Sequence, residues 1–400
     1  MKRDSRALES ALAELDRQHL SRRRWTVERL LDRTRPGEPD GAYVLVEGRR
    51  LADFCSNDYL GLARHPALAQ ALAESATRDG TGSGASHLVS GHAREHDLLE
   101  DELAAFTGRE RALLFSTGYM ANLAAICALA GRGERVLLDR LSHASLIDAA
   151  LLSGARFARF AHADASAASR ALQEHSDETA LVATDGVFSM DGDLAPLPEL
   201  ARQAAAHGAW LVVDDAHGLG VIGRSGRGTL EHFGLGEAEV PVLVGTLGKA
   251  FGTFGAFVAG SRDLVEYLMQ RARTYIYTTA LPPAVAAATR KALALAQSET
   301  WRRERVHALT TRFRAAAAAA GIPLLPSDTP IQPVLLGDSE RALEASAALR
   351  EAGFWVTAIR PPTVPPGSAR LRITLSAAHL EHQVDSLVEA LAGALEKLPR

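Results

Sequence analysis

Cysteine is scarce, with two residues in a chain of 400. Cys55 and Cys127 lie far apart in apolar surroundings, so they form neither a disulfide framework nor the paired spacing of a zinc-binding motif. We expect both to be reduced, buried thiols. The sequence therefore gives no reason to expect a fold held together by disulfides or by structural zinc.

The chain also lacks an excess of charge and long apolar runs. Its formal net charge of -4 is slight for this size, so no overall field favours nucleic acid or an anionic membrane. No uncharged segment reaches the roughly 20 residues of a membrane span, and residues 1–24 lack the apolar block of a secretory signal. Together with 47% hydrophobic content, these features predict a cytoplasmic enzyme that acts on small molecules.

Helical and strand-like segments alternate along the chain. Residues 1–50 read as an amphipathic helix and a short strand near residues 43–46, which we interpret as an N-terminal arm. Strand-like runs follow at residues 112–115, 135–138, 180–183, 210–213 and 242–244, with helical stretches between them. This pattern predicts an α/β fold whose mostly parallel sheet is flanked by helices in a large domain, residues 51–290. Residues 291–400 are expected to form a smaller α+β domain.

Lys249 carries the strongest chemical signal because it lies among small residues in a glycine-rich run, Gly245 to Gly252. A lysine without neighbouring charges can be desolvated, which favours the neutral amine that attacks a carbonyl. Asp214 ends the apolar run at residues 210–213, where a carboxylate can pair with a pyridinium nitrogen in a dry pocket. The two residues together predict a site for an aldehyde cofactor.

Other polar motifs also follow predicted strands, where the ligands of parallel sheets collect. Ser116 to Tyr119 opens a helix whose amides can hold a phosphate, although such residues are ordinarily a simple N-cap. His143 follows the strand near residue 138, where an imidazole can lie over a flat ring. The acids between Asp185 and Asp193 suggest a calcium loop, but the ligand spacing of an EF-hand is not met. We therefore expect no metal site.

Two further patterns have competing interpretations. Gly218 to Gly223 spells GxGxxG, a dinucleotide fingerprint, but a charged quartet precedes it and a loop follows instead of a helix. An NAD-dependent oxidoreductase is thus a distant alternative. Arginines at 360, 370 and 372 suit carboxylate binding, yet surface arginines, including the run at residues 22–24, are more often solvated.

Several stretches together resemble the α-oxoamine synthases, which are fold type I enzymes that use pyridoxal 5'-phosphate (PLP). The stretches span nearly the whole chain and comprise residues 54–62, 82–84, 141–145, 185–193, 213–218, 246–249 and 358–365. The resemblance implies a decarboxylative condensation of an amino acid with an acyl thioester. A non-catalytic subunit with the same fold is an alternative, but the joint presence of Lys249, Asp214, His143 and His217 disfavours it.

The resemblance also implies a role for each matching position around the cofactor. Lys249 would hold PLP as a Schiff base, Asp214 would pair with the ring nitrogen, His217 would hydrogen-bond the phenolic oxygen, and His143 would stack on the ring. The other cofactor contacts would be Gly118, Tyr119 and Thr246, mainly at the phosphate, and Ser189 at a point that stays open. Asp185 departs from the family pattern, where glutamate is common.

Substrate and subunit contacts are implied in the same way. Thr278 and Thr279 resemble the segment that reaches the phosphate of a neighbouring subunit, which implies a homodimer with shared active sites. Arg372 resembles the clamp for the amino-acid carboxylate, and Arg22 and Thr363 resemble acyl-substrate contacts. Ser142 and the string from Arg360 to Thr363 favour the member of biotin biosynthesis that joins L-alanine to a pimeloyl thioester. The alternative is a sibling that uses glycine. The acyl carrier, coenzyme A or acyl carrier protein, stays open.

Overall fold

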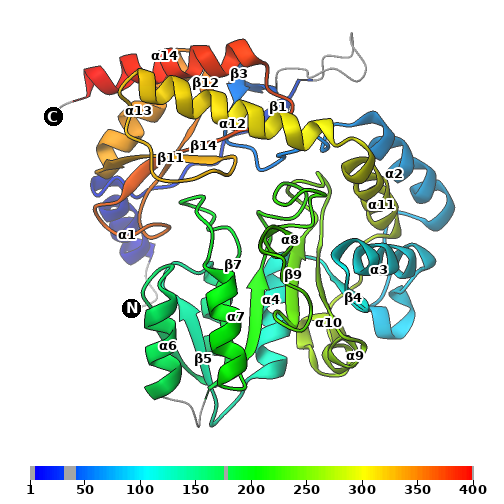
Figure 1. Ribbon diagram of the computed structural model, residues 1–400. Helices are drawn as coiled ribbons and strands as arrows, with labels where there is room; N and C mark the ends of the chain where they lie inside the picture. Colours follow the sequence, from blue (N-terminus) through cyan, green and yellow to red (C-terminus); the bar gives the residue numbers. More distant parts are fainter. Residues whose placement is uncertain (1–4, 31–41, 175–178, 399–400) are drawn as a thin grey trace. The chain divides into compact units, whose positions relative to one another are not determined.

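The computed structural model describes residues 5–30, 42–174 and 179–398, and the chain divides into two compact units. We call residues 58–189 and 193–304 the central unit, and residues 1–57, 190–192 and 305–400 the terminal unit. Each unit is described by itself below (Figure 1).

A seven-stranded sheet forms the middle of the central unit (Figure 1). Its order is β4-β10-β9-β8-β7-β5-β6, and only β10 runs antiparallel to its neighbours. The predicted, mostly parallel sheet is therefore confirmed. The strands are β4 (Arg111–Phe115), β5 (Arg135–Asp139), β6 (Arg156–Phe160), β7 (Thr179–Asp185), β8 (Trp210–Asp214), β9 (Val242–Thr246) and β10 (Ala256–Gly260).

Helices cover both faces of this sheet because the central strands are apolar on both sides. Along β8, Val212 packs into one hydrophobic cluster, and its neighbours Leu211 and Val213 pack into the other. The first cluster includes α4 (Gly118–Leu129), α5 (Ala144–Ser153) and α9 (Arg262–Arg271), and the second includes α6 (Ala165–Glu174) and α7 (Leu197–Ala206). This double burial explains why the strands read as continuous apolar runs.

The central unit contains further helices, both short and long. They are α2 (Pro66–Asp79), the π-helix η1 (His87–Gly91), α3 (Arg94–Thr107), α8 (Thr229–Phe233), α10 (Arg273–Ile276) and α11 (Pro283–Ser298), followed by α12 (Trp301–Ala319), which continues into the terminal unit. The alanine-rich stretches at residues 284–296 and 315–319 lie in α11 and α12.

Two strands of the central sheet were not predicted from the sequence. β6 is an edge strand with charged residues and partial exposure, so it lacks the apolar run of a buried strand. β10 is fully buried, but its five residues follow a glycine-rich loop and contain too little pattern to separate a strand from a turn.

The terminal unit joins both ends of the chain in its sheets. One sheet has the order β1-β2-β3-β12 and the other β11-β14-β13. Their strands are β1 (Val27–Arg29), β2 (Tyr43–Val46), β3 (Arg49–Asp53), β11 (Ile331–Gly337), β12 (Phe354–Trp355), β13 (Thr357–Ile359) and β14 (Ala369–Thr374), and the unit's own helices are α1 (Ser5–Arg17), α13 (Ser339–Glu351) and α14 (Glu381–Lys397). The pairing of β3 with β12 ties the N-terminal arm to the C-terminal segment.

The limits of the units fall after residues 57 and 304, apart from the short excursion at 190–192. The predicted domain limits at residues 50 and 290 stay a prediction. Among the described residues, no helix is long and apolar enough to cross a membrane.

Candidate active site

The central unit places most of the predicted site residues at one edge of its sheet. Asp185, Asp214 and Thr246 are the last residues of β7, β8 and β9, which run parallel to one another. His143 follows β5 as the N-cap of α5. Because parallel strands end at the same edge, these side chains gather where α/β proteins bind ligands.

Asp214 is buried and oriented by two hydrogen bonds. It is 5% exposed, and its carboxylate accepts from the Asn122 side-chain amide at 2.7 Å and from the Ala216 amide at 3.0 Å. The same Asn122 nitrogen lies 2.8 Å from Ser145 Oγ. The carboxylate therefore has a fixed direction in a dry environment, as a partner for a ring nitrogen requires.

Lys249 lies in the turn after β9 and is half-buried. Its Nζ is 3.4 Å from Thr246 Oγ1, at the long end of hydrogen-bond range. The charges of both Lys249 and Asp214 act on His143: burial lowers the pKa of His143, Asp214 raises it, and Lys249 lowers it further. The amine, the carboxylate and the imidazole thus share one electrostatic environment.

His143 is held through its backbone as well as its ring. Its amide donates to Asp185 Oδ2 at 2.9 Å, and its Nδ1 lies 2.7 Å from Ser145 Oγ. Asp185 is buried, and burial, followed by the charge of Asp214, raises the pKa of its carboxyl well above the usual range. The shorter acid at position 185 therefore still reaches the backbone of His143.

His217 forms a buried pair with Tyr59. Its Nδ1 lies 2.7 Å from the Tyr59 hydroxyl, and their side chains are 8% and 1% exposed. Tyr59 lies in the matching stretch at residues 54–62, although the resemblance implies no role for it, and Asn122 lies outside all the matching stretches. Helical spacing offers a signal for Asn122, since it lies one turn after Gly118 on α4.

The start of α4 forms a close approach suited to a phosphate. Thr117 caps the helix by accepting from the Met120 amide, and a Cβ at Gly118 would lie 2.7 Å from the Thr246 methyl group. Only glycine allows the helix N-terminus to approach β9 so closely, and its exposed amides favour an anion. Tyr119 is partly exposed and donates its hydroxyl to Asp148.

The donor set of the central unit fits PLP by its chemistry. Lys249 offers an amine, Asp214 a buried carboxylate, His143 and His217 imidazoles, and the start of α4 a phosphate cradle. These are the groups needed to hold an aldehyde, a pyridinium nitrogen, a flat ring with a phenolic oxygen, and a phosphate.

The loop from Asp185 to Asp193 is braced beside this edge. Phe188 donates its amide to the Asp193 carbonyl at 3.0 Å, and the His162 ring lies between Asp139 and Asp193 at 2.9 Å from each. Ser189 lies half-buried in this loop. His162 and its two acids were not identified from the sequence, because 23 residues separate it from Asp139 and 31 from Asp193.

The GxGxxG string has a different role from dinucleotide binding. Residues 218–228 form turns, and the next helix, α8, begins only at Thr229. A Cβ at Gly186 would lie 2.7 Å from Asp215 Oδ1, and a Cβ at Gly218 or Gly228 would overlap the same carboxyl group. Within the string, Gly218, Gly220 and Gly223 make room for the side chains of Asp215, Ala250 and Glu231, so the string gives no support to an NAD site.

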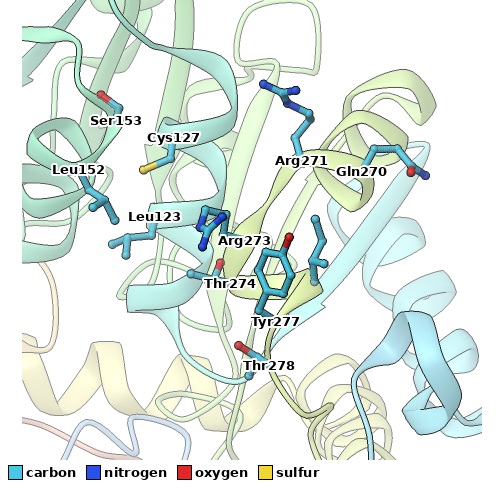
Figure 2. Close-up of a pocket in the computed structure, with 11 residues that line it drawn as sticks. Leu123, Cys127, Leu152, Ser153, Gln270, Arg271, Arg273, Thr274, Tyr277 and Thr278 are labelled. Carbon is cyan, nitrogen blue, oxygen red and sulfur yellow. The ribbon is translucent and has the colours of Figure 1, made fainter.

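Thr278 and Thr279 lie at an open part of the central unit, just after α10. Thr278 lines a cavity of about 670 Å³, and Figure 2 shows it beside Tyr277 at the cavity edge. Large apolar side chains are exposed nearby, with Tyr277 at 72% and Leu152 at 68%. The segment is therefore available to a partner.

The terminal unit holds the predicted substrate residues. Arg22 Nη2 lies 3.4 Å from Thr363 Oγ1, and both line a cavity of about 370 Å³. Among the described residues that line it, the charged ones are the arginines at 22, 23, 350 and 360. Burial, followed by the nearby charge of Arg22, lowers the pKa of Arg360. Arg23 forms an ion pair with Glu47, and the guanidinium groups at 22, 350 and 360 add positive charge that suits an anionic ligand.

Arg372 and Arg370 have different partners in the terminal unit, although both are buried on β14. Arg370 forms an ion pair with Asp191, whereas Arg372 donates to the neutral Asn57 amide oxygen at 3.1 Å. The role of Arg372 as the clamp for the amino-acid carboxylate stays a prediction.

Known proteins resemble the chain over nearly its whole length. Residues 49–391 match the family model of aminotransferase class I and II. The chain is 62% identical to 8-amino-7-oxononanoate synthase of Methylococcus capsulatus over 96% of its length and 97% of the relative's. It is 60% identical to the enzyme of the same name from Stutzerimonas stutzeri, with 98% and 97% covered.

A solved structure agrees with these matches. A serine palmitoyltransferase variant from S. paucimobilis, solved with PLP joined to myriocin, superposes with a TM-score of 0.90 at 31% identity, covering 98% of this chain and 97% of that one. The likeness therefore extends to an enzyme in which the cofactor is seen.

Proposed function

The chain belongs to the aminotransferase class I and II family, and we propose that it is a PLP-dependent 8-amino-7-oxononanoate synthase. It condenses L-alanine with a pimeloyl thioester and releases CO2, the free thiol carrier and 8-amino-7-oxononanoate, in biotin biosynthesis. The relatives at about 60% identity over nearly their full length carry this name. The observation that carries the chemistry is the buried Asp214 carboxylate at the sheet edge, whose direction is fixed by Asn122 and the Ala216 amide.

The roles of the central residues follow from their chemistry. When bound, PLP condenses with an amino group and withdraws electrons from the bonds at the adjoining carbon. Lys249 holds the cofactor and, once alanine has taken its place, its amine removes the proton from Cα. Asp214 directs its carboxylate at the ring nitrogen, because hydrogen bonds from Asn122 and the Ala216 amide fix its direction.

Other groups of the central unit hold the cofactor in position. His143 covers the flat ring, and His217 hydrogen-bonds its phenolic oxygen while Tyr59 orients the imidazole. Gly118, Tyr119 and Thr246 hold the phosphate end, and Ser189 makes a further contact. These assignments use groups that the sheet edge and the start of α4 already bring together.

The terminal unit supplies the substrate contacts in this proposal. Arg372 pairs with the carboxylate of alanine and thereby sets which Cα bond is activated. Arg22 and Thr363 contact the acyl substrate, and the arginine-lined cavity matches the free carboxylate at the far end of a pimeloyl chain. A monocarboxylic acyl chain would leave these guanidinium groups without that partner.

We further propose a homodimer in which Thr278 and Thr279 reach the phosphate of the neighbouring subunit. Their open position and the exposed apolar side chains of Tyr277 and Leu152 support a subunit contact. The acyl carrier is coenzyme A or acyl carrier protein. Both carriers are found in the cytoplasm, which agrees with the expected location of the enzyme. That location stays a prediction.

A substrate panel tests the proposed function. The full-length holoenzyme is incubated with alanine, glycine or serine and with pimeloyl or shorter thioesters on each carrier, and the aminoketone is detected by mass spectrometry. We expect alanine and pimeloyl thioester to give the highest kcat/KM. A preference for glycine would transfer the assignment to a sibling synthase, and a colourless protein that responds only to NAD would overturn the PLP chemistry.

A further inference from the structure

Three histidines converge at the turn that precedes α3. His87 lies in η1, His92 follows it, and His96 lies in the first turn of α3. Their ring centroids are 5.0, 5.0 and 5.4 Å apart, and one ring nitrogen from each lies within 4.8 Å of the other two. The three belong to one short segment of the central unit and have no role in the proposed reaction.

Hydrogen bonds to two of these rings determine which nitrogens carry lone pairs. His96 Nε2 lies 2.8 Å from the Leu281 carbonyl oxygen, which can only accept, so His96 Nδ1 has the lone pair. Accordingly, His96 Nδ1 accepts the Ala93 amide at 2.9 Å. His92 Nε2 faces Asp97 Oδ1 at 2.8 Å, which leaves Nδ1 of the neutral ring as the acceptor.

His87 completes the cluster through His92. The two Nδ1 atoms are 2.8 Å apart, so His87 donates a proton that His92 accepts. A carboxylate or carbonyl that holds the outer nitrogen of a histidine is the usual support of a metal ligand, because it fixes the tautomer and the ring direction. Asp97 and the Leu281 carbonyl stand in these two outer positions.

The cluster is largely shielded from solvent. His96 is 0% exposed, and the half-buried His87 ring stacks on Tyr275. A neutral imidazole is the form that binds a metal.

We propose that His87, His92 and His96 bind one divalent transition-metal ion, with Zn²⁺ as the natural candidate and Asp97 and the Leu281 carbonyl as outer supports. Three imidazoles suit Zn²⁺ with a fourth, water ligand. The ion replaces two hydrogen bonds: the His87 proton moves from Nδ1 to Nε2, and the Ala93 amide is released from His96. Zinc–nitrogen bonds of about 2.0–2.1 Å require only small ring movements here.

The proposed metal has a structural consequence for the segment that follows α10. The His87 ring stacks on Tyr275 with centroids 4.8 Å apart, and the Ala280 amide donates to the Ala85 carbonyl at 3.0 Å. A β-bridge joins Ser86 to Thr279. A metal that fixes the turn at residues 87–92 therefore stabilises the segment carrying Thr278 and Thr279. It takes no part in the chemical step.

Direct metal binding tests the proposal. The full-length holoenzyme is treated with a chelator, dialysed and titrated with Zn²⁺ by calorimetry, and Co²⁺ is added in parallel to follow its visible d–d bands. We expect one saturable site per chain with micromolar or tighter affinity, and a rise in thermal midpoint on saturation. His92→Ala should abolish the Co²⁺ bands, and Asp97→Asn should weaken binding about 10- to 100-fold.

His232→Ala is the matched control because this histidine is exposed on α8, outside the cluster; its binding curve should equal that of the wild type. Asp97→Asn keeps the test valid if His92→Ala does not fold, since Asp97 is exposed. Absence of saturable binding in the wild type would overturn the proposal. Equal affinity in the wild type and both cluster variants would overturn it too, by placing the ion at the cofactor or elsewhere.

Discussion

The carboxyl edge of the central sheet and the arginine-lined cavity of the terminal unit satisfy their charges in different ways. At the sheet edge, polar groups are partnered within the protein, as Asp214 is by Asn122 and His217 by Tyr59. In the cavity, the described charged lining residues all carry the same sign. Arg360 is instead held by backbone carbonyls, including that of Ser21 at 3.0 Å.

The partners at the sheet edge hold reactive groups in place, whereas the arginines of the cavity are available to bind a ligand. A buried group with two partners keeps one orientation, so its replacement changes the chemical step or the stability. A cluster of like charges attracts an anionic substrate, so its replacement changes substrate binding. The comparison predicts losses in kcat at the sheet edge and rises in KM at the cavity.

Lys249→Ala gives the largest effect and tests the sheet edge most directly. Loss of the amine removes both the covalent attachment of the cofactor and the base. We expect kcat to fall by at least about 10²- to 10⁴-fold, the range that a general base supplies. Single-turnover assays of the purified variant measure this. Lys291→Ala, which removes another of the chain's four lysines, is the control and should keep wild-type activity.

Arg22→Ala tests the cavity. The variant removes one guanidinium from the group that faces the acyl substrate, so KM for the pimeloyl thioester should rise about 10- to 100-fold, the usual loss for a charged hydrogen bond, with kcat changed little. Steady-state kinetics with alanine at saturation measure both constants. Arg24→Ala, an exposed neighbour, is the control. A fall in kcat without a change in KM would contradict the distinction between the two regions.

The sequence predicts the sheet edge well because one rule covers it. Parallel strands end together, so polar residues after apolar runs identify Asp214 and His143 without any knowledge of contacts. Cavity residues such as Arg22 and Thr363 follow no such rule, since 341 residues separate them. Their roles as acyl-substrate contacts were implied only by resemblance to a family.

The hydrogen-bond partners that support the site residues could not be predicted from the sequence. Tyr59 meets His217 across 158 positions, and His162 meets two acids from different loops. Such pairs depend on the order of strands in the sheet, where β5 lies between β6 and β7. Neither β6 nor β10 carries a pattern strong enough to reveal that order from local sequence.

His162→Gln tests whether internal partnering stabilises the sheet edge. Burial alone lowers the pKa of His162, but hydrogen bonds and charges from Asp139 and Asp193 outweigh it and raise the pKa to about 10. Because the folded pKa exceeds the ordinary value of about 6.5, the stabilisation is complete below pH 6.5 and is lost as the pH rises through 10. The variant should lose roughly 2–4 kcal/mol at pH 6.5.

The pH series distinguishes this ion pair from simple packing. Thermal midpoints of wild type and variant should differ by several degrees at pH 6.5, and the gap should narrow toward pH 10. His207→Gln is the control, since this ring contacts the backbone carbonyl of Gln203, and it should show no such trend. A constant gap across the series would mean that the ring acts through its packing against Phe188.

Asp215→Asn has the smallest expected effect and separates the two adjacent acids. Asp215 is 0% exposed, and burial, followed by the charge of Asp214, raises its pKa to about 8 although Thr229 donates an amide hydrogen bond at 2.7 Å. The folded protein therefore holds a neutral acid at pH 7. Asparagine has the same shape and no charge, so activity should stay within about threefold of wild type.

The stability of Asp215→Asn relative to the wild type should rise with pH, as that of His162→Gln does, but over a lower pH range. The unfolded carboxyl ionises near pH 4 and the folded one near pH 8, so folding of the wild type becomes less favourable as the pH rises between these values. The variant escapes this cost, and its thermal midpoint should gain on the wild type from pH 5 to pH 8. If it instead fell steadily behind, Asp215 would be ionised in the folded state, and the three glycines around it would serve a charged group.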